Sequence, residues 1–340
     1  MRTAAAFRQT SLLLRRSFSQ SASSSSSSVK RIVEISSSSP ASRSATLASK
    51  PSPAVVSRKG GRRARSSVSM NAIVDEVTKE KPKTIYLKDY QTPAYEFEHV
   101  NLSFQLNEEQ TTVSSSIDVR VQRKNETLFL HGDKSMQLDA VLVNGTQVAD
   151  ERLTRTNAGL FVSGLPEEDF KLKIVTTIKP QENTALEGLY KSSGNYCTQC
   201  EAEGFRRITF YQDRPDVMSK FTTRMEAAKD KYPVLLSNGN LIDSGDADGG
   251  RHFAVWEDPW RKPSYLFALV AGNLAKIEDS FTTMSGKKVD LRIYTEPHNI
   301  DKADHAMVSL IKSMKWDEDT FGLEYDLELF NIVAVDDFNM

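Results

Sequence analysis

The first residues that could do chemistry are the only two cysteines of this 340-residue chain, Cys197 and Cys200, which form a CxxC pair. Such a pair can hold a metal ion or carry out thiol–disulfide exchange. A structural zinc site needs a second pair of soft ligands, and the sequence contains no further cysteine. A redox CxxC opens a helix after a strand, whereas this pair lies in a β-rich stretch. We therefore expect two ordinary thiols in a reducing compartment.

The histidines show no pattern typical of a catalytic metal site. None belongs to an HExxH motif, in which two histidines on one helix bind zinc beside a general-base glutamate. His298 and His305 lie seven residues apart near Asp301 and Asp304, and a solvated helix face explains them better than a metal site does. The nucleophile motif GxSxG is absent as well. The residues alone therefore indicate no catalytic residue and no set of metal ligands.

The densest polar segment is Tyr196–Asp216, with the sequence YCTQCEAEGFRRITFYQDRPD. Its charged residues are Glu201, Glu203, Arg206, Arg207, Asp213, Arg214 and Asp216. One interpretation is a strand whose charges pair with one another on its solvent face, where each pair contributes little to stability. The other is a binding site, because clustered ionisable groups are typical of functional sites. Taken without further information, the segment favours the first interpretation.

The elements that must position these residues are mainly strands. From Tyr95 to about Val270 the sequence has β texture, and Glu96–Gln105 and Thr111–Gln122 alternate polar and apolar residues with period two. Turn-forming residues separate the segments. We expect a mostly β fold, either a long antiparallel sandwich or a large bent sheet. The further expected strands are Thr127–His131, Leu160–Ser163, Phe170–Ile178, Arg207–Tyr211, Phe253–Trp256 and Tyr265–Ala271.

The texture changes near Asn273. After a strand at Val289–Tyr294, the segment Asp301–Phe321 has one apolar helical face, with Asn299 or Asp301 as its expected N-cap and Gly322 at its end. The residues of that face are Ala303, Ala306, Met307, Leu310, Ile311 and Met314. Leu329–Val335 is almost entirely apolar, and we expect a strand buried on both sides. A second domain therefore begins here and is expected to be incomplete at Met340.

Charge divides the chain into two parts. Residues 1–70 contain 13 Lys or Arg and one acid, Glu34, which leaves 31 basic and 44 acidic residues in 71–340. An acidic body repels phosphate, so nucleic acid is not an expected partner. No apolar stretch approaches the length of a membrane span, so no membrane partner is expected either.

The first 70 residues also contain 22 serines. An Arg-rich, Ser-rich and acid-poor N-terminus is typical of an organelle transit peptide. We expect one at 1–70, followed by a linker at 71–83. Its length and serine content favour a plastid, whereas the segment RRSFS favours a mitochondrion. The alternative is a disordered basic tail without a targeting role.

Several segments together resemble one enzyme family. They are NTALEGLYKSSGNYCTQCEAEGFRRITFYQDRPD at 183–216, KYPVLLSNGN at 231–240, FALVAGNL at 267–274 and SMKWDEDTFGLEYDLELFNIVAVDDFNM at 313–340. They resemble the aminopeptidase N family, the bacterial and plant alanyl aminopeptidases among the zinc metallopeptidases. The resemblance covers roughly Thr84 to Met340, and it is greatest to the organelle-targeted plant type.

The resemblance implies a saddle-shaped N-terminal β-domain at 84–273 and the start of a thermolysin-like α+β catalytic domain at 274–340. In the family, one zinc is held by HExxH and a later Glu, after a GxMEN motif; all of these would follow Met340. We therefore expect the N-terminal part of a zinc aminopeptidase that binds no zinc and is inactive by itself. The alternative is a non-catalytic β-domain protein that binds peptide amines.

The resemblance also implies a substrate site. The expected partners are peptides with a free N-terminus, whose α-ammonium has a pKa of about 8 and is largely charged at neutral pH. A carboxylate of the family's QCEAEGF motif binds this group, which corresponds to Glu201, with the amide of Gln199 near the first side chain. Met340 corresponds to the residue that lines the pocket for that side chain. Glu203, Arg206 and Arg207 are expected to be structural.

Overall fold

The fold is that of a computed structural model, which describes residue 84 and residues 86–336. The expected transit peptide at 1–70, the expected linker at 71–83 and Met340 lie outside the described residues. One compact unit runs from Thr92 onward, and the strands and helices below belong to it. Before Thr92 the structure describes a single short 3-10 turn, η1 (Leu87–Asp89).

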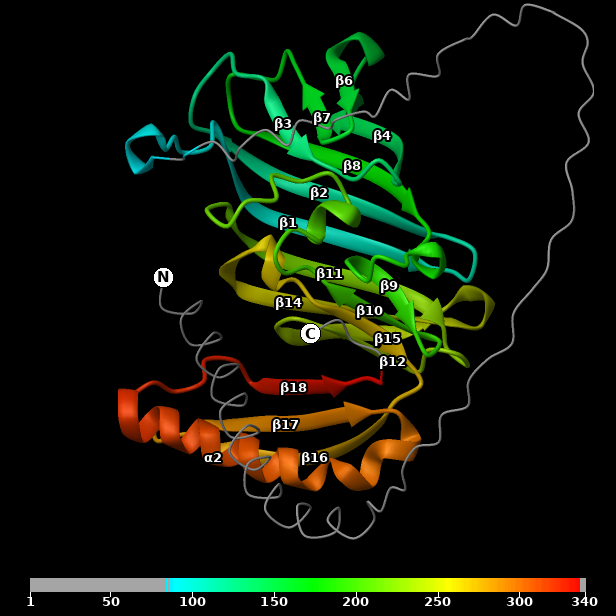
Figure 1. The fold of residues 1–340 in the computed structure, drawn as a ribbon, viewed down its shortest axis with the longest axis vertical. Coiled ribbons are helices and arrows are strands. Elements are labelled where there is room, and N and C mark those ends of the chain that lie inside the picture. The colour runs from blue at the N-terminus through cyan, green and yellow to red at the C-terminus, as the bar shows by residue number, and fades with distance from the viewer. Residues whose placement is uncertain (1–83, 85, 337–340) are drawn as a thin grey trace, which may run out of the picture. The chain divides into compact units, whose positions relative to one another are not determined.

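The largest sheet has eight strands, and alternate side chains of its central strands point into the core (Figure 1). In β1, for example, Phe97, Leu102 and Phe104 are buried. β1 and β11 are parallel, and every other neighbouring pair is antiparallel. In spatial order the strands are β13 (Asn240–Ala247), β14 (Arg251–Pro263), β11 (Met218–Ala228), β1 (Tyr95–Leu106), β2 (Thr111–Val121), β8 (Phe170–Ile178), β4 (Gln137–Val143) and β5 (Thr146–Gln147).

Two smaller sheets share a single hydrophobic core with the large one. The first has the order β12 (Val234–Ser237), β15 (Leu269–Gly272), β10 (Asn195–Gln199) and β9 (Gly188–Ser192). The second has the order β3 (Leu128–His131), β7 (Gly159–Val162) and β6 (Leu153–Thr156). Aromatic rings join the layers: Phe267 stacks on Phe104 with ring centroids 6.0 Å apart, and Phe205 meets Phe267 edge-on at 5.4 Å.

The C-terminal part has its own smaller core. Strands β16 (Ala275–Thr282), β17 (Lys288–Thr295) and β18 (Leu329–Ala334) form a sheet in this order, with β17 and β18 parallel. Helix α2 (Asp304–Phe321) packs along this sheet (Figure 1) and buries Met307, Leu310 and Met314. The remaining short 3-10 elements are η2 (Asp150–Arg152), η3 (Pro180–Glu182), η4 (Phe205–Arg207), η5 (Asp248–Gly250), η6 (Ser264–Leu266) and η7 (Pro297–Lys302).

The expectation of a mostly β fold is confirmed, but two expected strands differ. Arg207–Tyr211 is not a strand: η4 ends at Arg207, and only Tyr211 makes an isolated bridge, to His131. Ile208, Phe210 and Tyr211 are all fully buried, and three buried side chains in four positions do not fit the alternation of a strand. The expected strand Tyr265–Ala271 is divided between η6 and β15.

Two expectations for the C-terminal part are also wrong. β18 is half-buried from Leu329 to Val333, because among the described residues it pairs only with β17. Neither Asn299 nor Asp301 caps α2, because both lie within η7 and the helix begins after Ala303 without a side-chain cap. Gly322 ends the helix in the left-handed conformation, as expected. In the described part of the chain, no helix is long and apolar enough to cross a membrane.

Candidate functional site

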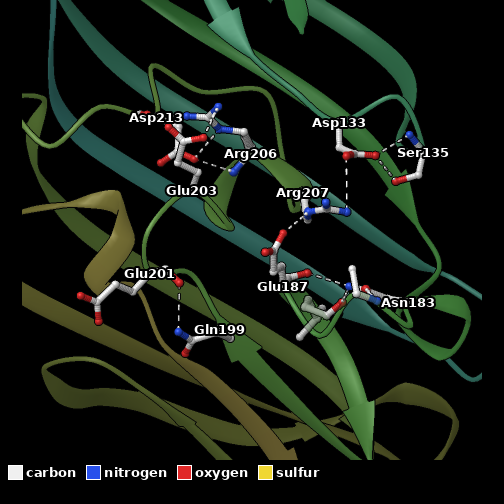
Figure 2. A network of polar contacts seen from close by, with 12 residues as sticks. Asp133, Ser135, Asn183, Glu187, Gln199, Glu201, Glu203, Arg206, Arg207 and Asp213 are labelled. Atoms are coloured by element: carbon white, nitrogen blue, oxygen red, sulfur yellow. Dashed lines mark hydrogen bonds and ion pairs between the residues drawn. The ribbon is translucent and has the colours of Figure 1, made fainter. Parts of the chain in front are cut away.

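The candidate site is a tight turn, Cys200–Gly204, that follows β10 and precedes η4 (Figure 2). The turn is closed by the N–H of Gly204, which donates to the carbonyl of Cys200 at 2.9 Å. A Cβ at Gly204 would lie 2.3 Å from the carbonyl oxygen of Gln199, so only glycine fits. Cys200 and Gly204 are buried, whereas Glu201 and Glu203 are exposed. The fold therefore anchors both ends of the turn and presents its two carboxylates to solvent.

Gln199 supports this turn from the end of β10. Its side chain is buried, and its Nε2 donates a hydrogen bond to the backbone carbonyl of Glu201 at 3.0 Å. Figure 2 shows the amide directed at the turn backbone. The peptide bond between Glu201 and Ala202 is cis. Two of the three residues expected to bind substrate, Gln199 and Glu201, are thus in contact, while Met340 is outside the described residues.

The two exposed carboxylates of the turn differ in their partners. Glu203 pairs with Arg206, with 3.1 Å between Oε2 and Nη1, although its side chain is 70% exposed. Among the described residues, the carboxylate of Glu201 makes no ion pair or hydrogen bond, and in Figure 2 it points away from the arginines. An unpaired exposed carboxylate is available to bind a cation from solution.

Arg206 connects the turn to a buried acid, Asp213, whose side chain is only 2% exposed. Both the backbone N–H and the Nε of Arg206 donate to Asp213 Oδ2, at 3.1 and 3.0 Å. The other oxygen, Oδ1, accepts from Ser264 Oγ at 2.6 Å. The N–H of Asp213 donates to His131 Nδ1 at 3.2 Å. Burial, and then the nearby Arg206, lower the pKa of His131, which keeps this ring nitrogen available as an acceptor.

Arg207 holds the opposite side of η4. Its Nε lies 3.0 Å from Glu187, and its Nη1 lies 3.4 Å from Asp133. Burial alone would raise the pKa of Asp133, but hydrogen bonds from Ser135 and the charge of Arg207 bring it below its usual value. The interpretation of self-paired charges is therefore partly correct. The correction is that the segment leaves the strand after Gln199, and that Arg207 pairs with residues outside the segment.

Sequence reasoning did not identify Asp213 or Ser264 as part of this site. Asp213 was grouped with the solvent-facing charges, yet it is buried at the centre of the network. The available signal was its position among the large apolar residues of ITFYQD, where an acid needs buried donors. Ser264 lies 51 residues away in sequence, so no local pattern joins the two.

The thiols and the histidines do not extend the site. Cys197 and Cys200 are free and buried, and burial raises the pKa of Cys197 to about 12, so the reactive thiolate is disfavoured. His298 pairs with Asp336 at 3.2 Å on the surface. Within the described residues, no group of three His, Cys, Asp or Glu side chains could hold a metal ion. These residues therefore do not fit a zinc site.

Comparisons with known proteins give this geometry its context. Residues 91–266 match the Peptidase M1 N-terminal domain. Aminopeptidase N of Escherichia coli is 49% identical over 265 residues, which are 77% of this chain and 30% of the relative. The crystal structure of Legionella pneumophila aminopeptidase A in complex with aspartic acid is 33% identical, with a TM-score of 0.70, covering 74% of this chain and 30% of that one.

A more distant structure shares the fold alone. It is an M1 zinc metallopeptidase from Deinococcus radiodurans bound to a Tyr-Ser-Ala substrate, with a TM-score of 0.59 and 16% identity, covering 73% of this chain and 58% of that one. The chain spans 30% of the length of the aminopeptidase N relatives that it matches. Because the family match covers more than half of its residues, the chain belongs to the M1 peptidases and contains the N-terminal domain of an M1 aminopeptidase.

Proposed function

We propose that this chain supplies substrate recognition to a zinc-dependent aminopeptidase that removes residues from the N-termini of peptides. In this role Glu201 binds the α-ammonium group of the substrate. The single observation that carries the proposal is that Glu201 alone, of the two exposed carboxylates on the turn, has no basic partner among the described residues. Membership of the M1 peptidases supports the type of substrate.

The chemistry of an exopeptidase requires such a group. The α-ammonium of a peptide, with a pKa of about 8, is the feature that distinguishes its end from every internal residue. A carboxylate at a fixed place binds this charge and sets the distance from the first residue to the reacting groups. Glu201 suits this task because both ends of its turn are anchored in the core while its side chain is exposed.

Gln199 has a supporting role in this proposal. Its bond to the Glu201 carbonyl fixes the backbone that carries the carboxylate, and its side chain is only 8% exposed. Met340, which lies outside the described residues, lines the pocket for the first side chain of the substrate. Both assignments extend the expectation from sequence and await direct measurement.

Zinc belongs to the reaction of the family, where it activates water for hydrolysis. The described residues do not fit a zinc site. The part assigned to them is therefore to bind and orient the peptide terminus. Known relatives fit this division of tasks, since Legionella aminopeptidase A has been crystallised with aspartic acid and the Deinococcus enzyme with a Tyr-Ser-Ala substrate.

We place the protein in an organelle, a plastid or a mitochondrion, with the plastid favoured. The support is the composition of residues 1–70, with 13 basic residues, 22 serines and one acid.

The test uses what we call the holoenzyme: the zinc-loaded aminopeptidase of which, in this proposal, the chain is the N-terminal part. The coding sequence after Met340 should continue in frame with GxMEN and HExxH. The purified holoenzyme should hydrolyse an alanyl chromogenic substrate and lose activity with a chelator. A stop codon directly after Met340, together with peptide binding but no hydrolysis, would instead establish the non-catalytic alternative. Hydrolysis of N-acetylated peptides at the same rate would refute the role of the free amine.

A further inference from the structure

The Glu201 turn is connected to the protein core by one buried acid, Asp213. We propose that Asp213 and Arg206 form a positioning pair that holds the Glu201 carboxylate where a substrate ammonium can reach it. The inference rests on the proposed function of Glu201 and adds two residues that do not themselves touch substrate.

Asp213 is enclosed and fully engaged by the protein. Its side chain is 2% exposed, and each carboxylate oxygen accepts a hydrogen bond from a defined donor: Oδ2 from Arg206, and Oδ1 from Ser264. Its backbone carbonyl also accepts from Arg206 Nη2 at 3.0 Å. A carboxylate that is used in this way cannot bind substrate. Its role is to fix the elements that supply its donors.

Those elements come from separate parts of the fold. Arg206 lies in η4, directly after the turn, and Ser264 lies in η6, just before β15. β15 pairs with β10, the strand that leads into the turn from its other side. The N–H of Asp213 reaches His131 at the end of β3. Asp213 therefore fixes the two segments that flank the turn relative to each other and to the main core.

Arg206 carries this constraint outward to the turn itself. Its guanidinium contacts Asp213 through Nε and Nη2, and its remaining nitrogen, Nη1, lies 3.1 Å from Glu203 Oε2. Glu203 lies two residues after Glu201, and Gln199 holds the Glu201 carbonyl from the preceding side. Glu201 is thus placed between two braces (Figure 2), and only the later one depends on a buried charge.

The consequence is measurable because catalysis is sensitive to misplacement of a binding group by a fraction of an ångström. Asp213→Asn keeps the shape of the side chain but presents an amide to the donors of Arg206. We expect KM of the holoenzyme for an alanyl substrate to rise about tenfold, while kcat stays within about twofold, because uniform binding is lost and the reacting groups remain. Simple destabilisation would lower the active fraction, and hence apparent kcat, without changing KM.

Glu226→Gln is the matched control. Glu226 is also an acid held by arginines, with Arg251 at 3.0 Å and Arg224 at 2.8 Å, and its side chain is 15% exposed. It lies on β11 and makes none of the contacts around η4. We expect this variant to melt earlier without a change in KM. If both variants shift KM equally, or if Asp213→Asn leaves KM unchanged, the positioning role is refuted.

Two further variants keep the test decisive. If Asp213→Asn does not fold, Ser264→Ala removes one donor from Asp213 more gently, and KM should rise about two- to fivefold; an unchanged KM in this variant refutes the inference. Glu201→Gln is measured alongside. Should it retain parental efficiency, the proposed function itself fails. Should it lose efficiency while Asp213→Asn and Ser264→Ala keep the parental KM, only the positioning role fails.

Discussion

Replacing Glu201 with glutamine removes the charge proposed to bind the substrate, while keeping the size of the side chain and its ability to accept a hydrogen bond. A hydrogen bond to a charged group contributes about 1.5–3 kcal/mol. At about 1.4 kcal/mol for each factor of ten, kcat/KM should fall by roughly ten- to a hundredfold or more. The fold should be unaffected, because the carboxylate of Glu201 makes no contact among the described residues.

The assay is kcat/KM of the holoenzyme on an alanyl chromogenic substrate, with thermal melts of the same samples. Its pH dependence adds a specific readout. Above about pH 8 the substrate amine loses its proton, so the parental enzyme should lose its advantage and approach the Glu201→Gln variant. A difference that stays constant from pH 6.5 to pH 9 would show that the charge of Glu201 does not meet the ammonium.

Glu203→Gln is the control for this prediction. It breaks the contact with Arg206, but the side chain is 70% exposed and such surface pairs contribute about 0–1 kcal/mol. The expected loss of kcat/KM is therefore at most about fivefold. If Glu203→Gln is strongly impaired while Glu201→Gln retains near-parental efficiency, the assignment of the two carboxylates is wrong.

Three more predictions follow from the same structure. Gly204→Ala should destabilise the fold by about 1–3 kcal/mol and raise KM, since its Cβ would meet the Gln199 carbonyl at 2.3 Å; denaturant unfolding and kinetics measure both. The thiols of Cys197 and Cys200 should react with a thiol reagent at pH 8 only after unfolding; because their folded pKa values are raised, the stability they contribute is full below about pH 8.5 and is lost as pH rises above it, which melts from pH 7 to 11 would show. The first 70 residues fused to a fluorescent protein should direct it to plastids or mitochondria, and a diffuse cytosolic signal would contradict this.

The strands that were predicted well have apolar residues at every second position. β8 begins and ends where the sequence placed it, because Phe170, Leu172 and Ile174 alternate with lysines and a valine. β11 was missed although it lies near the centre of the large sheet. Its inward positions include Ser219 and Thr223, which are buried at 0% and 2% exposure. Polar residues that hydrogen-bond within the core interrupt the apolar alternation on which such a prediction depends.

The opposite error occurred at Arg207–Tyr211. The segment RITFY has the composition of a strand, yet its apolar side chains enter the core from irregular backbone after η4. Phe205 and Tyr211 meet edge-on with ring centroids 5.0 Å apart, which requires the chain to turn sharply between them. Composition describes how apolar a segment is, but tertiary packing decides its backbone path.

The identity of the available carboxylate could not be obtained from local sequence. The polar segment holds four acids and three arginines, so at least one acid lacks a partner within it, but counting does not say which. Arg206 contacts Asp213 and Glu203, and Arg214 contacts Asp216 at 2.6 Å. Arg207 is taken by Asp133 and Glu187, which lie outside the segment. These long-range pairs, which only the fold establishes, leave Glu201 as the acid without a basic partner among the described residues, and this asymmetry is why substitution of Glu201 and Glu203 should give different results.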